Sequence, residues 1–235
     1  MTGSKRKAIT LGIALTMAAA HAQAAVVLSE GFDAVAGLGG AGWVLTNESS
    51  PVGTTGWFQG NSGVFPAHSG AADSYVAANF ENATTGGAIS NWLITPEISL
   101  DGNVTLSFWT RTVFGSPFAD RLEVRLSDSG GASNTASFDT LLLTINLALA
   151  VGGYPETWTE FTTNFGGAGV GAGATGRLAL RYTVDNTDLQ GNYIGVDTLS
   201  IDVSSNAVPE PASLAMTTLA LAGLALTRRR RRRRC

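Results

Sequence analysis

The sequence predicts an all-β domain, a β-sandwich of the jelly-roll type, with a targeting segment at each end of the chain. Apolar and charged residues alternate most clearly in 121–126, where Leu122, Val124 and Leu126 would share one face of a strand. Similar stretches recur between runs rich in Gly, Asn, Asp and Pro, and none of them shows a helical period with caps at both ends. Many short strands in one domain favour a double-sheet arrangement, because it protects strand edges.

The stretches with this pattern predict about nine strands in the body of the chain. They cover 26–28, 74–80, 92–95, 104–110, 121–126, 141–147, 158–165, 178–184 and 193–203. The Gly-rich segment 166–176 is expected to be a flexible loop. A phosphate-binding loop is excluded there, since no Lys-Ser/Thr pair follows the glycines.

Composition and charge narrow the class of protein. The 235 residues include five Trp, ten Phe and four Tyr, which is ample core material, and the only cysteine is Cys235, so a disulfide framework is excluded. Residues 25–209 hold five Arg, no Lys and 17 acidic residues, a net charge of −12. Such an acidic body should repel nucleic acid and anionic membranes, and it makes cations plausible partners.

The N-terminus has the pattern of an export signal, which we assign to residues 1–24. A basic Lys5-Arg6-Lys7 precedes an apolar run, and Ala22-Gln23-Ala24 offers the small-x-small site that signal peptidase requires. The alternative is a short buried helix, for which the flanking residues are wrong. The mature chain is expected to begin near Ala25.

The C-terminal segment 207–235 combines Pro209-Glu210-Pro211, an apolar run over 212–227 and seven consecutive Arg at 228–234. The apolar run is shorter than the roughly 20 residues of a comfortable membrane span, and the Arg run would stay cytoplasmic. A plain tail anchor and a transient stop-transfer signal are both compatible with this pattern. Cys235 has no assigned role, since the residues before it do not form a prenylation box.

In its order and terminal position this tail resembles the PEP-CTERM sorting signal of Gram-negative bacteria that make extracellular polysaccharide. The resemblance implies a transient anchor in the inner membrane and recognition by an exosortase-type membrane protease. Cleavage near Pro209, Glu210 and Pro211 would then release the protein or transfer it to the cell surface.

The body, assigned as residues 25–206, also resembles a family. The likeness rests on Glu30–Asp33, Ala72–Phe80, Asn91–Pro96, Leu106–Arg111, Asp120–Leu126, Gly153–Trp158 and Tyr193–Asp197, in that order. Together they look like the choice-of-anchor J domain, which is related to the cleaved-adhesin and MAM-type jelly rolls. The resemblance implies a surface β-sandwich and no particular activity.

Calcium is the metal that this resemblance and the acidic charge favour. The first strand of such a jelly roll lies near the last, which would bring Glu30 and Asp33 close to Asp197. Ca²⁺ prefers six to eight oxygen ligands, and it could clamp the two chain ends in the absence of disulfides. The alternative is that these acids are solvated. Thr198 stands where the family has a second acidic residue, so no ligand is expected from that position.

No catalytic residue is assigned, and the prediction is a protein that is not an enzyme. His68 is the only histidine after the leader, and no Gly-x-Ser-x-Gly elbow accompanies it. One histidine cannot supply the two or three His or Cys ligands of a catalytic zinc. A hydrolase with two carboxylates stays open as a weak alternative.

The sequence therefore favours an exported structural or adhesive protein that is associated with extracellular polysaccharide or with surface proteins. The alternative is a carbohydrate-binding module that recognises the secreted polymer. Trp57, in a Gly- and Gln-rich setting, is the candidate for stacking on a sugar ring, although core packing would also explain it.

Overall fold

The computed structural model describes residues 24–166 and 173–204. Residues 1–23 of the predicted export signal, the sorting motif Pro209-Glu210-Pro211 and the centre of the Gly-rich loop lie outside the described residues. By their contacts, residues 23–206 form one compact unit. Within the described ranges, no helix is long and apolar enough to cross a membrane.

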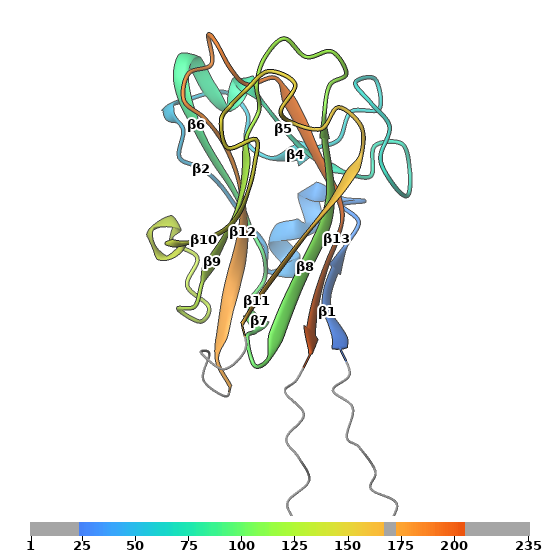
Figure 1. The fold of residues 1–235 in the computed structure, drawn as a ribbon, viewed down its shortest axis with the longest axis vertical. Helices are drawn as coiled ribbons and strands as arrows, with labels where there is room; N and C mark the ends of the chain where they lie inside the picture. The colour runs from blue at the N-terminus through green and yellow to red at the C-terminus, as the bar shows by residue number, and fades with distance from the viewer. Residues whose placement is uncertain (1–23, 167–172, 205–235) are drawn as a thin grey trace, which may run out of the picture. The chain divides into compact units, whose positions relative to one another are not determined.

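Two antiparallel sheets make up this unit (Figure 1). Sheet A has the order β11 (Thr159–Gly166), β8 (Asn103–Thr112), β13 (Tyr193–Ser204), β5 (Val76–Asn79) and β4 (Phe58–Gln59), and β1 (Ala24–Glu30) also pairs with β13. Sheet B has the order β10 (Thr140–Ile145), β9 (Leu122–Ser127), β12 (Thr175–Val184), β6 (Ala83–Ile94) and β2 (Val44–Asn47). In addition, β3 (Ser50–Val52) pairs with β6, and β7 (Ile98–Ser99) pairs with β12. The predicted all-β sandwich is confirmed.

The core lies between the two sheets and follows the period of two that the sequence predicts. On β8, Val104, Leu106 and Phe108 are buried, while the residues between them are partly exposed. On β9 the same alternation buries Leu122 and Val124. Each of these large side chains contributes about 1.5–3 kcal/mol when it leaves water. The two inner faces therefore supply the main stabilisation of a chain without disulfides.

The first and last strands lie side by side, as predicted. β1 runs antiparallel to β13, with Ala24 opposite Ser204 and Glu30 opposite Leu199. At the other end of β13, Ile194 lies opposite Thr112 of β8. The segments 113–121, 146–158 and 185–192 therefore gather at the end of the sandwich opposite Ala24 and Ser204, and we call this the loop end (Figure 1).

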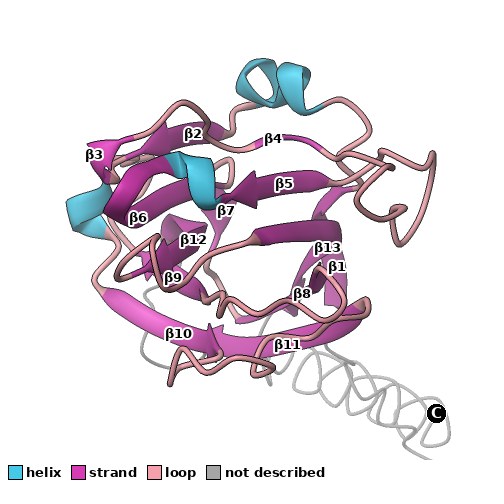
Figure 2. Ribbon diagram, turned by 90° about the horizontal axis from the view of Figure 1, so that it is seen from above, coloured by secondary structure: helices cyan, strands magenta, loops and turns pink. Residues whose placement is uncertain are grey.

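One edge of the sandwich is covered by a short 3₁₀ helix. β4 is the last strand of sheet A and β2 the last strand of sheet B, and η1 (Val35–Ala41) contacts both. Seen from above, η1 lies beside β2 and β4, while β10 and β11 lie at the opposite edge (Figure 2). The other 3₁₀ helices are η2 (Phe80–Asn82) and η3 (Thr135–Ser137).

Each of the nine predicted strands overlaps an observed one, but the short edge strands were missed. β2, β3, β4 and β7 have two to four residues each, too few to show an alternation. β6 begins at Ala83, well before the predicted 92–95, and its first half contains Thr84, Thr85 and two glycines. Pairing with β3 holds that half in the sheet despite its weak propensity, while β12 pairs with the second half from Ile89 to Ile94.

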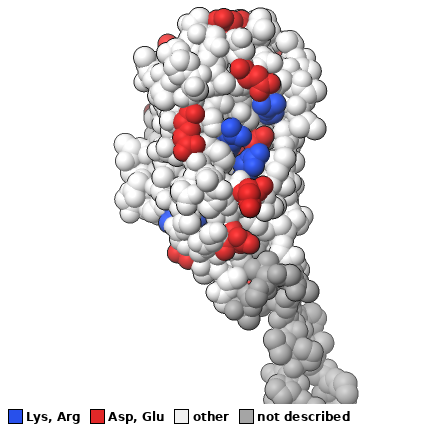
Figure 3. Space-filling view, turned by 90° about the vertical axis from the view of Figure 1, so that its left-hand side faces the viewer, with Lys and Arg blue, Asp and Glu red and all other residues white. Residues whose placement is uncertain are grey.

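Of the five Arg side chains among the described residues, three form ion pairs on the outer face of sheet B. Arg121 pairs with Asp185 at 2.8 Å, and Glu123 accepts from Arg125 at 2.7 Å and from Arg181 at 3.3 Å. Figure 3 shows this side of the molecule, with basic side chains interspersed among acidic ones. This face is therefore charge-compensated.

Candidate functional site

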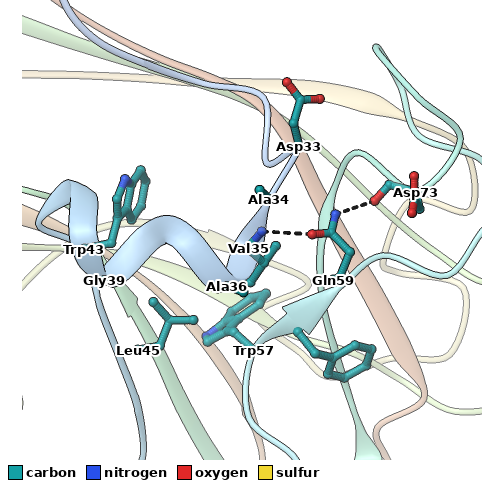
Figure 4. Close-up of a pocket in the computed structure, with 11 residues that line it drawn as sticks. Asp33, Ala34, Val35, Ala36, Gly39, Trp43, Leu45, Trp57, Gln59 and Asp73 are labelled. Atoms are coloured by element: carbon teal, nitrogen blue, oxygen red, sulfur yellow. Dashed lines mark hydrogen bonds between the residues drawn. The ribbon is translucent and has the colours of Figure 1, made fainter.

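A hollow opens at the sandwich edge, where η1 meets β2 and β4, and we call it the edge hollow. Its volume is about 770 Å³, within the range typical of small-molecule sites, roughly 300–1,000 Å³. It is lined by Asp33, Ala34, Val35, Ala36, Gly39, Trp43, Leu45, Trp57, Phe58, Gln59 and Asp73 (Figure 4). The lining therefore combines aromatic rings with two carboxylates and one amide.

Gln59 of β4 joins the segments that surround this hollow. Its Oε1 accepts a hydrogen bond from the Val35 amide at 2.8 Å. Its Nε2 donates to the carbonyl oxygens of Phe32 at 2.9 Å and Asp73 at 2.6 Å (Figure 4). One side chain thus holds the start of η1 and the segment before β5 against the end of sheet A.

Two indole rings form the inner wall. Trp43 is 3% exposed and Trp57 is 6% exposed. Trp57, the predicted stacking residue, is therefore buried in the wall and does not lie open on the surface. Its Nε1–H is shielded from solvent and has no hydrogen-bond acceptor among the described residues. Figure 4 shows this nitrogen on the side of the ring nearest Leu45, another lining residue.

The carboxylates of Asp33 and Asp73 are available to a ligand. Both residues are exposed, and neither carboxylate accepts a hydrogen bond or forms an ion pair within the described part of the chain. No Lys, Arg or His is among the lining residues. The edge hollow therefore presents negative charge beside an aromatic wall.

A second, smaller hollow shares Asp33 with the first. It has a volume of about 160 Å³ and is lined by Ser29, Glu30, Gly31, Asp33, Ser69, Gly70 and Thr198. Glu30 also accepts a hydrogen bond from the Phe32 amide at 2.7 Å. The two hollows adjoin at Asp33, and we refer to them together as the edge groove.

Asp197, the third predicted calcium ligand, does not line this groove. Its Oδ2 accepts the amide hydrogens of His68 at 2.8 Å and Ser69 at 3.0 Å, and its Oδ1 accepts the Thr198 amide. Burial raises the pKa of this carboxyl, although the backbone donors counteract the rise. We call this arrangement the Asp197 clamp, because it fastens the long segment before β5 to β13.

The predicted calcium ligands are thus only partly brought together. Glu30 and Asp33 line the same small hollow, while both oxygens of Asp197 already accept hydrogen bonds. Over residues 24–166 and 173–204, no three His, Cys, Asp or Glu side chains are grouped so that they could hold a metal ion. The predicted set does not fit a complete site, and calcium binding stays a prediction on which nothing below depends.

His68 takes part in the same clamp. Its ring stacks on Trp109 with 3.9 Å between centroids, and its Nδ1 lies 3.0 Å from the Thr198 hydroxyl. Trp109 therefore lies on the outer face of sheet A, whereas its neighbours Phe108 and Thr110 are buried. The histidine packs against this indole and fixes the segment before β5.

A buried carboxylate that the sequence did not single out lies at the loop end. Asp120 is fully buried and accepts hydrogen bonds from Thr112 and Tyr182, both at 2.7 Å, and from the Asn192 amide at 2.8 Å. Burial raises its pKa above that of an exposed aspartate, although its three hydrogen-bond donors counteract the rise. We call this arrangement the Asp120 knot, because it joins β8, β12 and the segment before β13. In the sequence Asp120 looks like any turn residue.

Comparison with solved structures places this architecture among adhesin domains. The K3 cleaved adhesin domain of Lys-gingipain from Porphyromonas gingivalis superposes with a TM-score of 0.55 at 22% identity, over 77% of this chain and 99% of that one. The K1 domain of the same protein gives a TM-score of 0.54 at 20% identity, over 77% and 98% of the two chains. No protein-family model matches the chain, and no curated protein matches its sequence.

The chain thus has a β-sandwich fold similar to that of cleaved adhesin domains, which confirms the part of the predicted resemblance that concerns the fold. At these identities the similarity concerns architecture alone. The choice-of-anchor J assignment and the sorting signal stay predictions.

Proposed function

We propose that this chain is an exported surface protein whose β-sandwich attaches to extracellular polysaccharide through the edge hollow. Its role would be structural or adhesive, carried out by carbohydrate binding. The observation that supports this proposal is the edge hollow itself, which combines Trp43 and Trp57 with free carboxylates in a volume of about 770 Å³. Carbohydrate sites need an apolar wall for the sugar ring and polar groups for its hydroxyls.

A filling mutation in η1 tests this proposal. Ala36 is exposed and lines the edge hollow, so Ala36→Trp should occupy the space of the ligand without disturbing the core. Ala136→Trp is the matched control, since Ala136 is an exposed alanine in another 3₁₀ helix, η3. We expect residues 24–206 to bind oligosaccharides by calorimetry, Ala36→Trp to lose at least about ten-fold in affinity, a change of 1.4 kcal/mol, and Ala136→Trp to bind as the unmodified protein.

Equal binding by the two variants would contradict the edge hollow as the site. No binding of any oligosaccharide would leave a structural protein whose partners are other surface proteins. Release of shorter sugars from the polymer would instead favour the hydrolase alternative. Repeating the titration with calcium and with a chelator tests the metal prediction in the same experiment.

For delivery to the surface we propose the sorting route that the tail predicts. An exosortase-type protease would cut near Pro209-Glu210-Pro211 after transient anchoring in the inner membrane of a Gram-negative host. Glu210→Ala should trap a longer, membrane-bound form, whereas Thr217→Ala, in the apolar run beyond the motif, should be processed normally. Fractionation and immunoblotting check this, and unchanged release of the Glu210→Ala protein would contradict the proposal.

A further inference from the structure

We infer that the domain has a second carbohydrate site, a hollow beside η2 that holds a neutral sugar on the ring of Phe80. We call it the Phe80 hollow. Its volume is about 400 Å³, within the range of roughly 300–1,000 Å³ that is typical of small-molecule sites. It is lined by Gly53, Thr54, Phe80, Glu81, Ala83, Thr84, Thr85 and Thr187. The inference goes beyond the proposed function, which concerns the edge hollow, and shares with it only the class of ligand.

The aromatic ring of this hollow is accessible to a ligand. Phe80 is 48% exposed, whereas Trp57 in the wall of the edge hollow is 6% exposed. An exposed phenyl ring offers an apolar face on which the C–H groups of a sugar ring can pack. Covering such a ring removes apolar surface from water, which is favourable by about 25 cal/mol per Å². The Phe80 hollow therefore provides the stacking surface that the edge hollow keeps buried.

The position of this ring is fixed by the backbone beneath it. The Phe80 amide donates to the Asn192 carbonyl at 2.9 Å, and the Glu81 carbonyl accepts the Thr54 amide, also at 2.9 Å. Asn82, the last residue of η2, is fully buried, and its side-chain amide donates to the segment between β3 and β4. A ligand therefore meets a preformed surface, and little conformational freedom is lost when it binds.

The polar groups of the hollow are mainly hydroxyls. Thr54, Thr84 and Thr85 are exposed, and none of their hydroxyls forms a hydrogen bond among the described residues. The Thr187 hydroxyl donates to the Thr84 carbonyl at 2.9 Å, so its oxygen can still accept a hydrogen bond. A hydroxyl both donates and accepts. These side chains can therefore pair with sugar hydroxyls in either direction, whereas a hydrocarbon would leave them unpaired.

Charge restricts the ligand to a neutral sugar. Among the described residues that line the hollow, Glu81 is the one with an ionisable side chain, and it is exposed. One of its oxygens accepts from the Asn79 side-chain amide at 3.3 Å, which leaves the other for a sugar hydroxyl. A uronic acid or a sulfated sugar would meet this carboxylate and a body with a net charge of −12.

Amide chemical shifts locate the binding site directly. Residues 24–206, labelled with ¹⁵N, are titrated with β-1,4-linked tetramers of glucose, mannose and galactose, and with the tetramer of mannuronic acid. We expect at least one neutral tetramer to shift the amide signals of Phe80, Glu81 and Thr85. The mannuronate tetramer should leave these signals unchanged.

Variants test the stacking surface and the hydroxyls, with the affinity read from the Glu81 amide. Phe80→Ala should bind about ten-fold more weakly, because the apolar surface that the sugar covers is gone. Phe114→Ala is the matched control, since Phe114 is 77% exposed and lines none of the three hollows described here. Thr85→Val keeps the shape and removes one hydroxyl, so a loss of about two- to five-fold is expected. Thr162→Val, at an exposed threonine of β11, should bind as the unmodified protein.

The outcomes separate this inference from the proposed function. Shifts at Val35 and Gln59 without shifts at the Phe80 hollow would overturn the second site and leave the edge hollow as proposed. Shifts confined to the Phe80 hollow, and retained in Ala36→Trp, would support the second site and contradict the edge hollow. No shifts with any tetramer would overturn both. Equal affinities of Phe80→Ala and Phe114→Ala would overturn the role of the ring, and equal binding of mannuronate would overturn the neutral sugar.

Discussion

The Asp120 knot and the Asp197 clamp each bury a carboxylate without a cationic partner, but the hydrogen-bond donors around the two carboxylates differ. At the loop end, two of the three donors to Asp120 are side-chain hydroxyls, those of Thr112 and Tyr182, which are themselves buried. At β13, the donors to Asp197 are mainly backbone amides, two of them from the exposed residues His68 and Ser69. If the carboxylate is removed, water can therefore bond to the amides of His68 and Ser69, but it cannot reach the buried hydroxyls around Asp120.

This comparison indicates which acids of the chain are structural. The two buried aspartates are fully occupied by hydrogen bonds inside the fold. The carboxylates of Asp33 and Asp73, which accept no hydrogen bond within the described residues, lie exposed at the edge hollow. The carboxylates that can meet a ligand are therefore those that the fold does not use.

Truncation of the two buried aspartates to alanine should give the largest difference between the two regions, measured as the loss in the free energy of unfolding. Asp120→Ala removes the acceptor of the buried Tyr182 hydroxyl and of the half-buried Asn192 amide, at about 1–3 kcal/mol each, while the Thr112 hydroxyl keeps the Tyr193 carbonyl as a partner. We therefore expect a loss of about 2–4 kcal/mol in the free energy of unfolding. Asp197→Ala should cost only about 1–2 kcal/mol, because water can reach the freed amides. Urea denaturation of both variants measures this.

Amide hydrogen exchange in the same two variants shows which parts of the domain each aspartate holds in place. Exchange should accelerate at the amides of His68 and Ser69 in Asp197→Ala, whereas Asp120→Ala should accelerate it across the whole domain. Equal losses of stability, or global acceleration in both variants, would show that the two regions do not differ in the way the structure indicates.

The architecture could be predicted from the sequence because it depends on a repeated local signal. The alternation of apolar and polar residues in 104–110 and 121–126 fixes which side chains face the core, and the tertiary structure follows that choice. The pairing of the first strand with the last followed from the resemblance. In the structure Glu30 and Asp33 line one hollow, whereas Asp197 accepts hydrogen bonds from distant amides such as that of His68, which leave no trace in the sequence.

The candidate site could be predicted less well, for a physical reason. The edge hollow is built from short segments that belong to different elements, namely η1, β2, β4 and the segment before β5. Gln59, which holds them together, lies in a strand of two residues and contacts positions 24 and 14 residues away. Trp57 was recognised as a candidate from its unusual neighbours, but its burial depends on η1, a Gly-rich segment without a helical period.

The pH dependence of stability should show a smaller difference between the same two regions and has an unusual sign. Burial raises the pKa of both carboxyls above the ordinary value of 3.8. The native state therefore binds protons more readily than the unfolded chain, and the contribution of these groups to stability decreases as pH rises above about 4. Asp120→Asn carries no titrating group, so the stability of the unmodified protein relative to this variant should increase as the pH falls from 7 toward about 4. Asp197→Asn should show a weaker effect of the same sign, since backbone donors stabilise the ionised form there.

Thermal unfolding over this pH range measures both, with Asp101→Asn as the control for an exposed carboxylate. A constant difference between the unmodified protein and Asp120→Asn would mean that Asp120 is ionised throughout and that its donors compensate fully for burial.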